Sequence, residues 1–254
     1  MGGSTAIIES DHELARFAAV AAGHALLAFR ADLGFDNPKG LRDGGDRLAH
    51  ELITSLLAEH RPGDAVLSEE GKDDQGRLAA ARVWIVDPLD GTREFGEDGR
   101  TDWAVHVALI ENGEPIAAAV SLPARDLVMT TFPVPATPRR APGRMRIVVS
   151  RSHTPPEALA IADELDAELL YMGSAGAKTM AVVLGDADAY VHLGGQYEWD
   201  SAAPVGVALA AGLKATRADG SQLVYNRASP WLPDQVVCRA DLHDRVIAAV
   251  RRAA

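Results

Sequence analysis

Acidic side chains stand at three places where a strand or a helix is expected to begin or end. Asp87 and Asp90 lie in one tight turn after a buried apolar run. Glu70 follows a short apolar run, and Asp200 stands at a helix entrance. Each acid also has an ordinary explanation, because Asp is common in turns and as a helix N-cap, and Glu is common in solvated loops. Taken one at a time, the positions leave both explanations open.

Brought together, these four acids would form a site for hard cations. Two bare carboxylates about 4 Å apart repel by about 4 kcal/mol at an effective dielectric of about 20, so several of them would not stay ionised without bound ions. An all-oxygen set suits Mg²⁺ or Mn²⁺, whereas zinc calls for closely spaced His or Cys, which this sequence lacks. The pattern therefore predicts a phosphatase site with several magnesium ions.

Periodicity indicates the elements that would position the acids in the first half of the chain. Ser10 and Glu13 form a capping-box pattern that opens a long amphipathic helix. A second apolar helix is expected to end at Arg61-Pro-Gly63, and Asn112-Gly113 predicts a hairpin. The expected second helix covers 48–57, and the expected strands cover 65–68, 82–87, 103–110 and 115–122.

The second half alternates strands with helices, which is typical of α/β architecture. Residues 133–143 hold four prolines without apolar periodicity and mark a boundary. We therefore expect a single catalytic domain of two lobes, about 1–143 and 144–254, with the active site between them. The expected strands are 146–150 and 187–193, and the expected helices are 156–165, 177–184 and 201–211.

Composition excludes several classes of function. The net charge of −11, from 36 acidic and 25 basic residues, would repel a nucleic-acid polymer. The longest apolar run, 202–213, is interrupted by Pro204 and is shorter than the roughly 18 residues of a membrane span. The N-terminus has no secretion pattern, and the single cysteine, Cys238, fits a reducing compartment. These features predict a cytoplasmic protein that does not bind membranes.

The motifs Asp87-Pro-Leu-Asp-Gly-Thr92 and Trp199-Asp-Ser-Ala-Ala203, with Ala211-Gly212, resemble the paired signature of the inositol monophosphatase superfamily. The resemblance spans most of the chain. It implies an α/β fold, the layered α-β-α-β-α sandwich of the sugar-phosphatase type. It also implies two or three Mg²⁺ ions, for which Mn²⁺ can substitute.

The resemblance assigns roles to individual residues. Glu70, Asp87 and the carbonyl of Leu89 would hold one ion, and Asp87, Asp90 and Asp200 a second. Glu70 would also help to hold a third.

In the family, a Thr hydroxyl paired with an Asp assists the attacking water, and Thr92 and Asp46 match these roles. The sequence before Asp46 departs from the family pattern, which leaves open that Asp46 is only the N-cap of the second helix. The backbone amides of Gly91 and Thr92, at the start of a short helix, would face the phosphate.

Other positions bear on the substrate, which the resemblance implies is a small phosphorylated molecule. Ser150-Arg-Ser-His153 resembles a segment of the 3'(2'),5'-bisphosphate nucleotidases in which the His contacts the nucleotide. Ser174 and Lys178 could bind a second phosphate, and Glu198 is placed to touch a substrate hydroxyl in the family. Each of these positions is also compatible with an ordinary structural or surface role.

The resemblance implies hydrolysis of the 3'-phosphate of 3'-phosphoadenosine 5'-phosphate to AMP, a step that clears a by-product of sulfate assimilation and is sensitive to lithium. Inositol-1-monophosphatase or fructose-1,6-bisphosphatase activity on the same metal core remains the alternative. A non-catalytic relative that keeps the fold is a further one. The sequence leaves a homodimer open.

Overall fold

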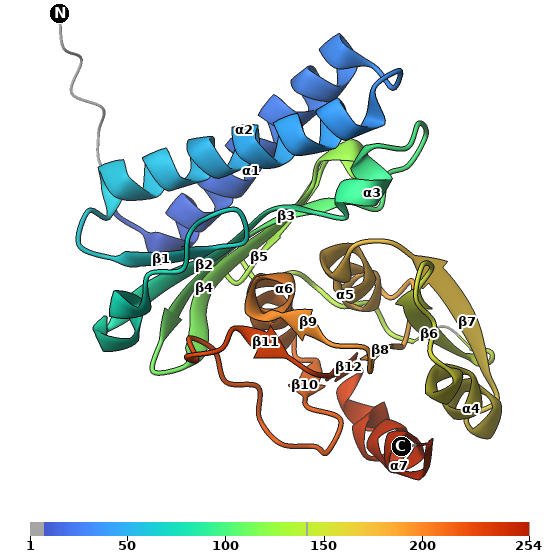
Figure 1. The fold of residues 1–254 in the computed structure, drawn as a ribbon. Helices are drawn as coiled ribbons and strands as arrows, with labels where there is room; N and C mark the ends of the chain where they lie inside the picture. The colour runs from blue at the N-terminus through green and yellow to red at the C-terminus, as the bar shows by residue number, and fades with distance from the viewer. Residues whose placement is uncertain (1–7, 141, 254) are drawn as a thin grey trace, which may run out of the picture.

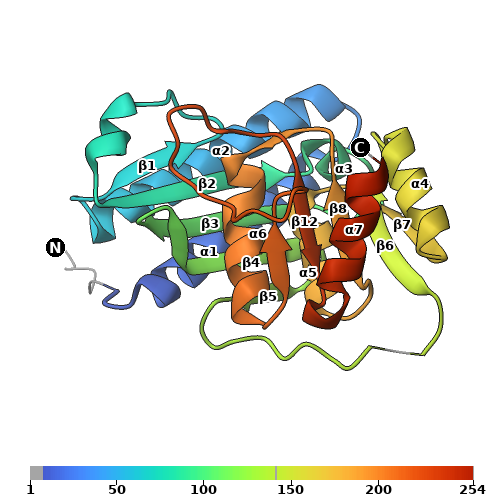
Figure 2. The same cartoon turned by 90° about the horizontal axis from the view of Figure 1, so that it is seen from below.

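Five layers of helices and sheets make up the computed structural model, which describes residues 8–140 and 142–253. Two outer helices cover a first sheet, two inner helices separate it from a second sheet, and two more helices cover the far side (Figures 1 and 2). This is the α-β-α-β-α sandwich that the resemblance implies.

The first layer consists of α1 (Asp11–Leu33) and α2 (Pro38–His60), which pack on each other and on the first sheet. The Ser10 side chain caps α1, and Asn37 followed by Pro38 starts α2. Helix α1 is long and apolar enough to cross a membrane by length and composition alone. Its small apolar side chains are buried against the sheet and α2, as in a core helix.

The first sheet has the strand order of the chain, β1-β2-β3-β4-β5. Strands β1 and β2 are parallel and the other pairs are antiparallel. Asn112 and Gly113, both with positive φ, form the β3–β4 turn, which confirms the predicted hairpin. The strands are β1 (Ala65–Ser68), β2 (Arg82–Asp90), β3 (Ala104–Glu111), β4 (Glu114–Leu122) and β5 (Leu127–Thr130), with short 3₁₀ turns at η1 (Gln75–Ala79) and η2 (Pro123–Arg125).

The second sheet has the order β10-β12-β8-β6-β7. Its strands are β6 (Met145–Ser150), β7 (Ala167–Met172), β8 (Ala189–His192), β10 (Lys214–Thr216) and β12 (Gln235–Cys238), and a small ribbon pairs β9 (Gln196–Tyr197) with β11 (Trp231–Leu232). Helices α4 (Pro156–Glu164) and α7 (His243–Ala253), the latter after η3 (Ala240–Leu242), cover its outer face. Strands β5, β7, β9, β10, β11 and β12 were not predicted, because their short runs lack clear turn signals. Helix α7 was also missed, although its buried residues Val246, Ile247, Ala249 and Val250 recur at helical spacing.

The middle layer consists of α5 (Ala175–Val183) and α6 (Glu198–Ala210), which contact each other and lie between the two sheets. Its apolar side chains join both inner sheet faces in one core. The first turns of both helices lie close to the end of β2, which the short helix α3 (Thr92–Phe95) follows in the chain. This arrangement positions the site described next.

Candidate active site

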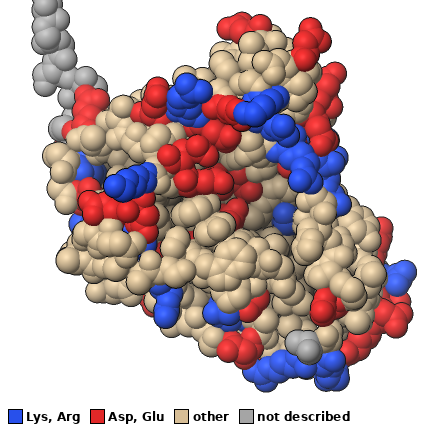
Figure 3. Space-filling model, viewed as in Figure 1, with Lys and Arg blue, Asp and Glu red and all other residues tan. Residues whose placement is uncertain are grey.

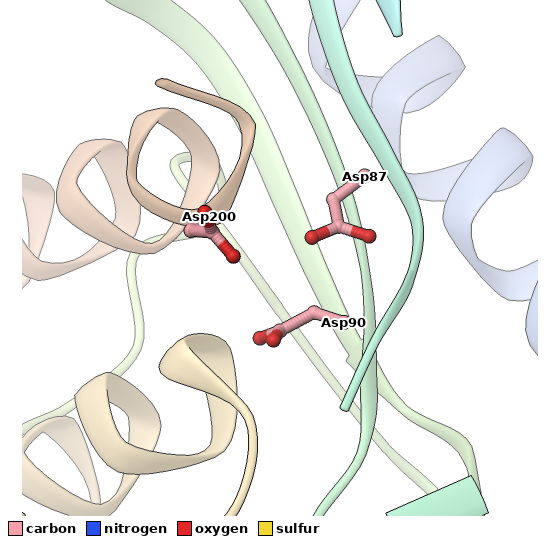
Figure 4. A group of neighbouring side chains, drawn as sticks. All are labelled: Asp87, Asp90 and Asp200. Atoms are coloured by element: carbon pink, nitrogen blue, oxygen red, sulfur yellow. The ribbon is translucent and has the colours of Figure 1, made fainter. Parts of the chain in front are cut away.

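Three aspartates converge between the first sheet and the inner helices. Asp87 and Asp90 come from β2 and Asp200 from α6, and each offers an oxygen atom within 4.8 Å of the others. Figure 4 shows the three carboxylates turned towards one another. In the space-filling view, acidic atoms gather in a hollow of the molecule, with basic side chains along its rim near α3 (Figure 3). The structure therefore brings together three of the four acids that the sequence singled out.

An irregularity in β2 puts two of the aspartates on one face. In a regular strand, residues three positions apart point to opposite faces. Here Asp87 pairs with His106 but Asp90 pairs with Ala104, so β2 carries one extra residue over this interval. Such a bulge suits Pro88, which cannot donate a ladder hydrogen bond. The expectation that the strand ends at Asp87 is wrong, because pairing resumes at Asp90.

The fourth acid that interacts with the three aspartates is Glu69, whereas the sequence pattern had indicated its neighbour Glu70. Ser68 of β1 lies beside Val86 of the parallel strand β2. Its hydroxyl is hydrogen-bonded to the imidazole of His50 in α2, so Ser68 faces the outer helices. Because successive side chains of a strand point to opposite faces, the next residue, Glu69, lies on the same face as Asp87, and the two carboxyl groups interact.

Glu70 follows on the alternate position of the chain, and its charge acts on Asp46 of α2. The register of β1 with β2 was the signal that could have separated the two. Partial desolvation and the charge of Asp200 raise the pKa of Glu69 to about 8, although its side chain is exposed.

Asp90 is surrounded by hydrogen-bond donors. Its carboxylate accepts the Ser174 hydroxyl at 2.5 Å and the backbone N–H groups of Ala175 at 3.1 Å and Gly176 at 2.7 Å. His106, which no sequence motif indicated, lies with its Nε2 3.2 Å from Asp90 Oδ2. Burial opposes ionisation, yet His106, Lys178 and Ser174 lower the pKa of Asp90 to about 2. Asp90 is therefore a fixed anion.

Ser174 and Lys178 have a different task from the one predicted. Ser174 caps α5 and donates to Asp90, so its hydroxyl is already engaged. Lys178 is 4% exposed, and its ammonium group donates to the carbonyls of Gly173 and Ser174 and lies over the Tyr190 ring. Both groups support the turn behind Asp90, and the geometry does not support the predicted binding of a second phosphate.

Asp200 lies in the first turn of α6, where one of its oxygens accepts the N–H of Tyr197 at 2.7 Å. Burial and the charge of Asp90 raise the pKa of Asp200 to about 6. Glu198, two residues earlier, is 1% exposed and accepts the N–H groups of Asn226 and Arg227. It secures that loop from inside the fold, so the expected contact with a substrate hydroxyl is wrong.

Thr92 and Asp46 face each other across the site. The Thr92 hydroxyl lies 3.4 Å from Asp46 Oδ1 and donates to the Leu89 carbonyl at 3.0 Å. Asp46 is in the middle of α2, which begins ten residues earlier than the predicted helix, so it is not an N-cap. Desolvation and the charge of Glu70 raise the pKa of Asp46 to about 7. Gly91, with φ 85°, makes the left-handed turn that starts α3 at Thr92.

His153 lies on the loop after β6, exposed at the surface. Its ring is close to Gly194, where an added Cβ would come within 3.0 Å of it. This places His153 next to the turn that leads to β9 and α6. The predicted contact of His153 with a nucleotide stays a prediction.

The residues present fit a divalent cation. Within the described part of the chain, buried Asp87 Oδ2 has no hydrogen-bond partner. Burial and the charges of Glu69, Asp90 and Asp200 raise the pKa of Asp87 well above its ordinary value. An ion among these oxygens would satisfy the free atom and remove the repulsion, and oxygen donors are those that Mg²⁺ prefers.

The sequence pattern of the inositol monophosphatase family matches residues 37–254. The chain belongs to the inositol monophosphatase family. This family is metal-dependent, and the acidic cluster of this member agrees with that property. Relatives include the 3'-phosphoadenosine 5'-phosphate phosphatase of Mycobacterium leprae, 52% identical over 95% of this chain and 94% of that protein. The 3'(2'),5'-bisphosphate nucleotidase CysQ of Escherichia coli K12 is 32% identical over 74% of this chain and 80% of its own length.

Solved structures of the family have the same architecture. CysQ from Bacteroides thetaiotaomicron superposes with a TM-score of 0.80 at 30% identity, covering 91% of this chain and 98% of that one. Inositol monophosphatase II from Staphylococcus aureus gives a TM-score of 0.78 at 21% identity, covering 93% and 91%. The second likeness shows the fold alone.

Proposed function

We propose that this family member hydrolyses the 3'-phosphate of 3'-phosphoadenosine 5'-phosphate to give AMP and phosphate. The observation that carries the proposal is the 52% identity, over nearly the full length of both chains, to a phosphatase named for this substrate. The CysQ relatives, named as 3'(2'),5'-bisphosphate nucleotidases, agree with it. The acid set described above supports turnover over a non-catalytic role.

The cofactor in this proposal is Mg²⁺, as two or three ions, with Mn²⁺ as a substitute. Glu69, Asp87, Asp90, Asp200 and the Leu89 carbonyl would hold the ions. When bound, such ions lower the pKa of water and neutralise charge on the phosphate and the leaving oxygen. The remaining steps fall to side chains of the chain itself.

Thr92 and Asp46 are proposed to activate the attacking water. The Thr92 hydroxyl can accept a hydrogen bond from water and donate to Asp46 once its single proton turns from the Leu89 carbonyl, to which it donates in the structure, towards Asp46 Oδ1. A general base works best when its pKa is close to the working pH, and the pKa of Asp46 at about 7 satisfies this condition. The Gly91 and Thr92 amides, at the start of α3, are proposed to face the phosphate.

Exposed aromatic rings next to Asp200 favour a nucleotide over a sugar phosphate. Tyr197 and Trp231 are 42% and 49% exposed, and their ring centroids lie 5.3 Å apart. The Trp199 ring stacks on the Tyr197 ring, with centroids 4.6 Å apart. Rigid aromatic faces stack on nucleobases, whereas inositol offers no such face. His153 and Arg93 of α3, which are both exposed, are proposed as further side chains that contact the nucleotide.

The chain is further proposed to act in the cytoplasm, on a small phosphorylated molecule, as one catalytic domain of two lobes divided near residue 143. The two sheets, which lie on either side of this position, support the division. The net charge of −11 supports the absence of a nucleic-acid polymer as partner. A homodimer remains an open proposal.

Steady-state phosphate release tests the function. The purified chain is compared on 3'-phosphoadenosine 5'-phosphate, inositol 1-phosphate and fructose 1,6-bisphosphate, with Mg²⁺ and with a chelator. We expect the nucleotide to give the highest kcat/KM, activity to require Mg²⁺, and Li⁺ to inhibit. A higher kcat/KM on inositol 1-phosphate would overturn the substrate assignment, and absence of release from all three would favour a non-catalytic protein.

A further inference from the structure

The imidazole of His106 lies where the segments that carry the three aspartates meet. His106 is on β3, fully buried, and faces the inner helices directly opposite Asp87 of β2. Its Nδ1 lies 3.1 Å from the carbonyl oxygen of Trp199, in the first turn of α6. Its Nε2 lies 3.2 Å from Asp90 Oδ2. One side chain therefore contacts β2 at Asp90 and α6 at the residue before Asp200.

Helix α5 leaves room for the ring only because residue 176 is glycine. A Cβ at Gly176 would stand 2.0 Å from His106 Nε2, far inside any allowed contact. The same glycine donates its N–H to Asp90. The ring, the glycine and the carboxylate therefore form one close-packed unit between β3, β2 and α5.

The two ring contacts differ in kind. Because a carbonyl oxygen can only accept, Nδ1 carries the proton that bonds Trp199. Nε2 is close to Asp90 but, among the residues that the structure describes, makes no hydrogen bond of good geometry. The ring acts there as a rigid spacer, which sets how far the carboxylate can approach α6.

We propose that His106 is a positioning residue that holds Asp90 and Asp200 at the separation required for a divalent cation. The proposal rests on the metal-dependent function proposed above and deepens it. His106 does not contact the substrate in this proposal; it acts through the two carboxylates. Residues that orient metal ligands from behind commonly change metal affinity by 10–100-fold when substituted.

Three substitutions separate the contacts. His106→Gln can place an amide nitrogen near the position of Nε2 and keep the Asp90 contact, and His106→Asn can keep the Trp199 contact. His106→Val removes both but suits a strand. The readout is Mn²⁺ binding to metal-free protein by isothermal titration calorimetry, with the melting temperature measured alongside. His60→Asn, at a buried histidine near the N-terminal segment, is the matched control.

We expect His106→Val to weaken Mn²⁺ binding by about 10–100-fold, the Gln and Asn variants to fall between it and the wild type, and His60→Asn to leave binding unchanged. Mn²⁺ affinity within about two-fold of wild type in a folded Asn or Gln variant, together with unchanged affinity in Val, would overturn the proposal. Should Val fail to fold, the Asn and Gln variants decide it by the same criterion. If the wild type itself does not bind Mn²⁺, the metal-dependent function fails, which is a distinct result.

A double-mutant cycle gives an independent check. Gly176→Ala should press on the ring and weaken Mn²⁺ binding in the wild type. The shorter side chain of His106→Asn leaves space for the added methyl group, so the effect of Gly176→Ala should be smaller in that background. Strictly additive effects would contradict the contact on which the proposal depends.

Discussion

Replacing Asp200 by Asn should raise the stability of the metal-free chain and remove most of its stabilisation by Mg²⁺. The substitution preserves shape, and the amide oxygen can still accept the N–H of Tyr197 at the start of α6. What it removes is the charge that faces Asp87 and Asp90. Most substitutions of a buried side chain lower the free energy of unfolding. Here we expect it to rise in the metal-free chain, because repulsion between carboxylates is removed.

Two routes give the size of this effect. Unit charges 4.8 Å apart, the limit that the three carboxylates satisfy, repel by about 3.5 kcal/mol at an effective dielectric of about 20. Burial and Asp90 raise the pKa of Asp200 from 3.8 to about 6, and about two units correspond to about 3 kcal/mol. For a chain of this size, such a gain shifts the melting temperature by roughly 5–10 °C.

The same charge attracts the cation. A divalent ion about 2.1 Å from one carboxylate oxygen would be attracted by about 16 kcal/mol at the same effective dielectric of about 20, and dehydration of the ion and the carboxylate offsets most of this attraction. A net loss of about 3 kcal/mol remains, which corresponds to about 100-fold in Mg²⁺ affinity.

Scanning calorimetry at pH 7.5, with a chelator and with saturating MgCl₂, measures both effects in one experiment. Glu157→Gln is the matched control, because Glu157 stands in the first turn of α4, away from the cluster. The reasoning is refuted if metal-free Asp200→Asn melts below the wild type while Mg²⁺ still raises its melting temperature by the wild-type increment.

Further predictions concern the other acids and the aromatic rim. Glu69→Gln should weaken Mn²⁺ binding by about 100-fold in calorimetry, whereas Glu70→Gln should change it by less than about 3-fold; the reverse order would restore the sequence assignment. Asp46→Asn should lower kcat by about 10²–10⁴ and abolish the fall in rate below about pH 7, and an unchanged pH–rate profile would exclude it as the base. Tyr197→Ala should raise KM for 3'-phosphoadenosine 5'-phosphate by about 10-fold and leave inositol 1-phosphate unaffected; equal effects on both would contradict base stacking. The pKa values of Asp46 and Glu69 are raised in the fold to about 7 and about 8, so their contribution to metal-free stability is complete below about pH 4 and is lost as the pH rises to about 8. The pKa of Asp87 is also raised, in the same direction. The gain in melting temperature from Mg²⁺ should therefore be larger at pH 8 than at pH 5, and an equal gain would count against this account.

Features that depend on local sequence could be predicted. The Asn112-Gly113 turn, the Ser10 cap and the strand 65–68 follow from turn chemistry, capping and apolar runs, and the structure has each of them. The two acidic motifs also sufficed to indicate that Asp87 and Asp200 meet. The residue types in these segments allow few other local conformations of the backbone.

Features that depend on which way a side chain faces could not be predicted from the sequence. The choice between Glu69 and Glu70 requires the register of β1 against β2, which involves residues far apart in the sequence. The sequence predicted that Lys178 binds a phosphate or lies on the surface, and only the packing of α5 between two sheets shows that it is buried. His106 looked like any polar residue in an apolar strand until β2, α5 and α6 were placed around it.

The site draws two of its aspartates from the bulge in β2 and the third from a different layer of the fold. Covalent backbone sets the interval from Asp87 to Asp90, so that pair keeps its spacing in any motion that leaves the strand intact. Asp200 belongs to another layer, and sliding of α6 over the sheet alters its distance to both. A cation bound by all three carboxylates would cross-link the first sheet to the inner helices. Binding of the ion would then oppose sliding of the layers over each other, and its release would remove this restraint.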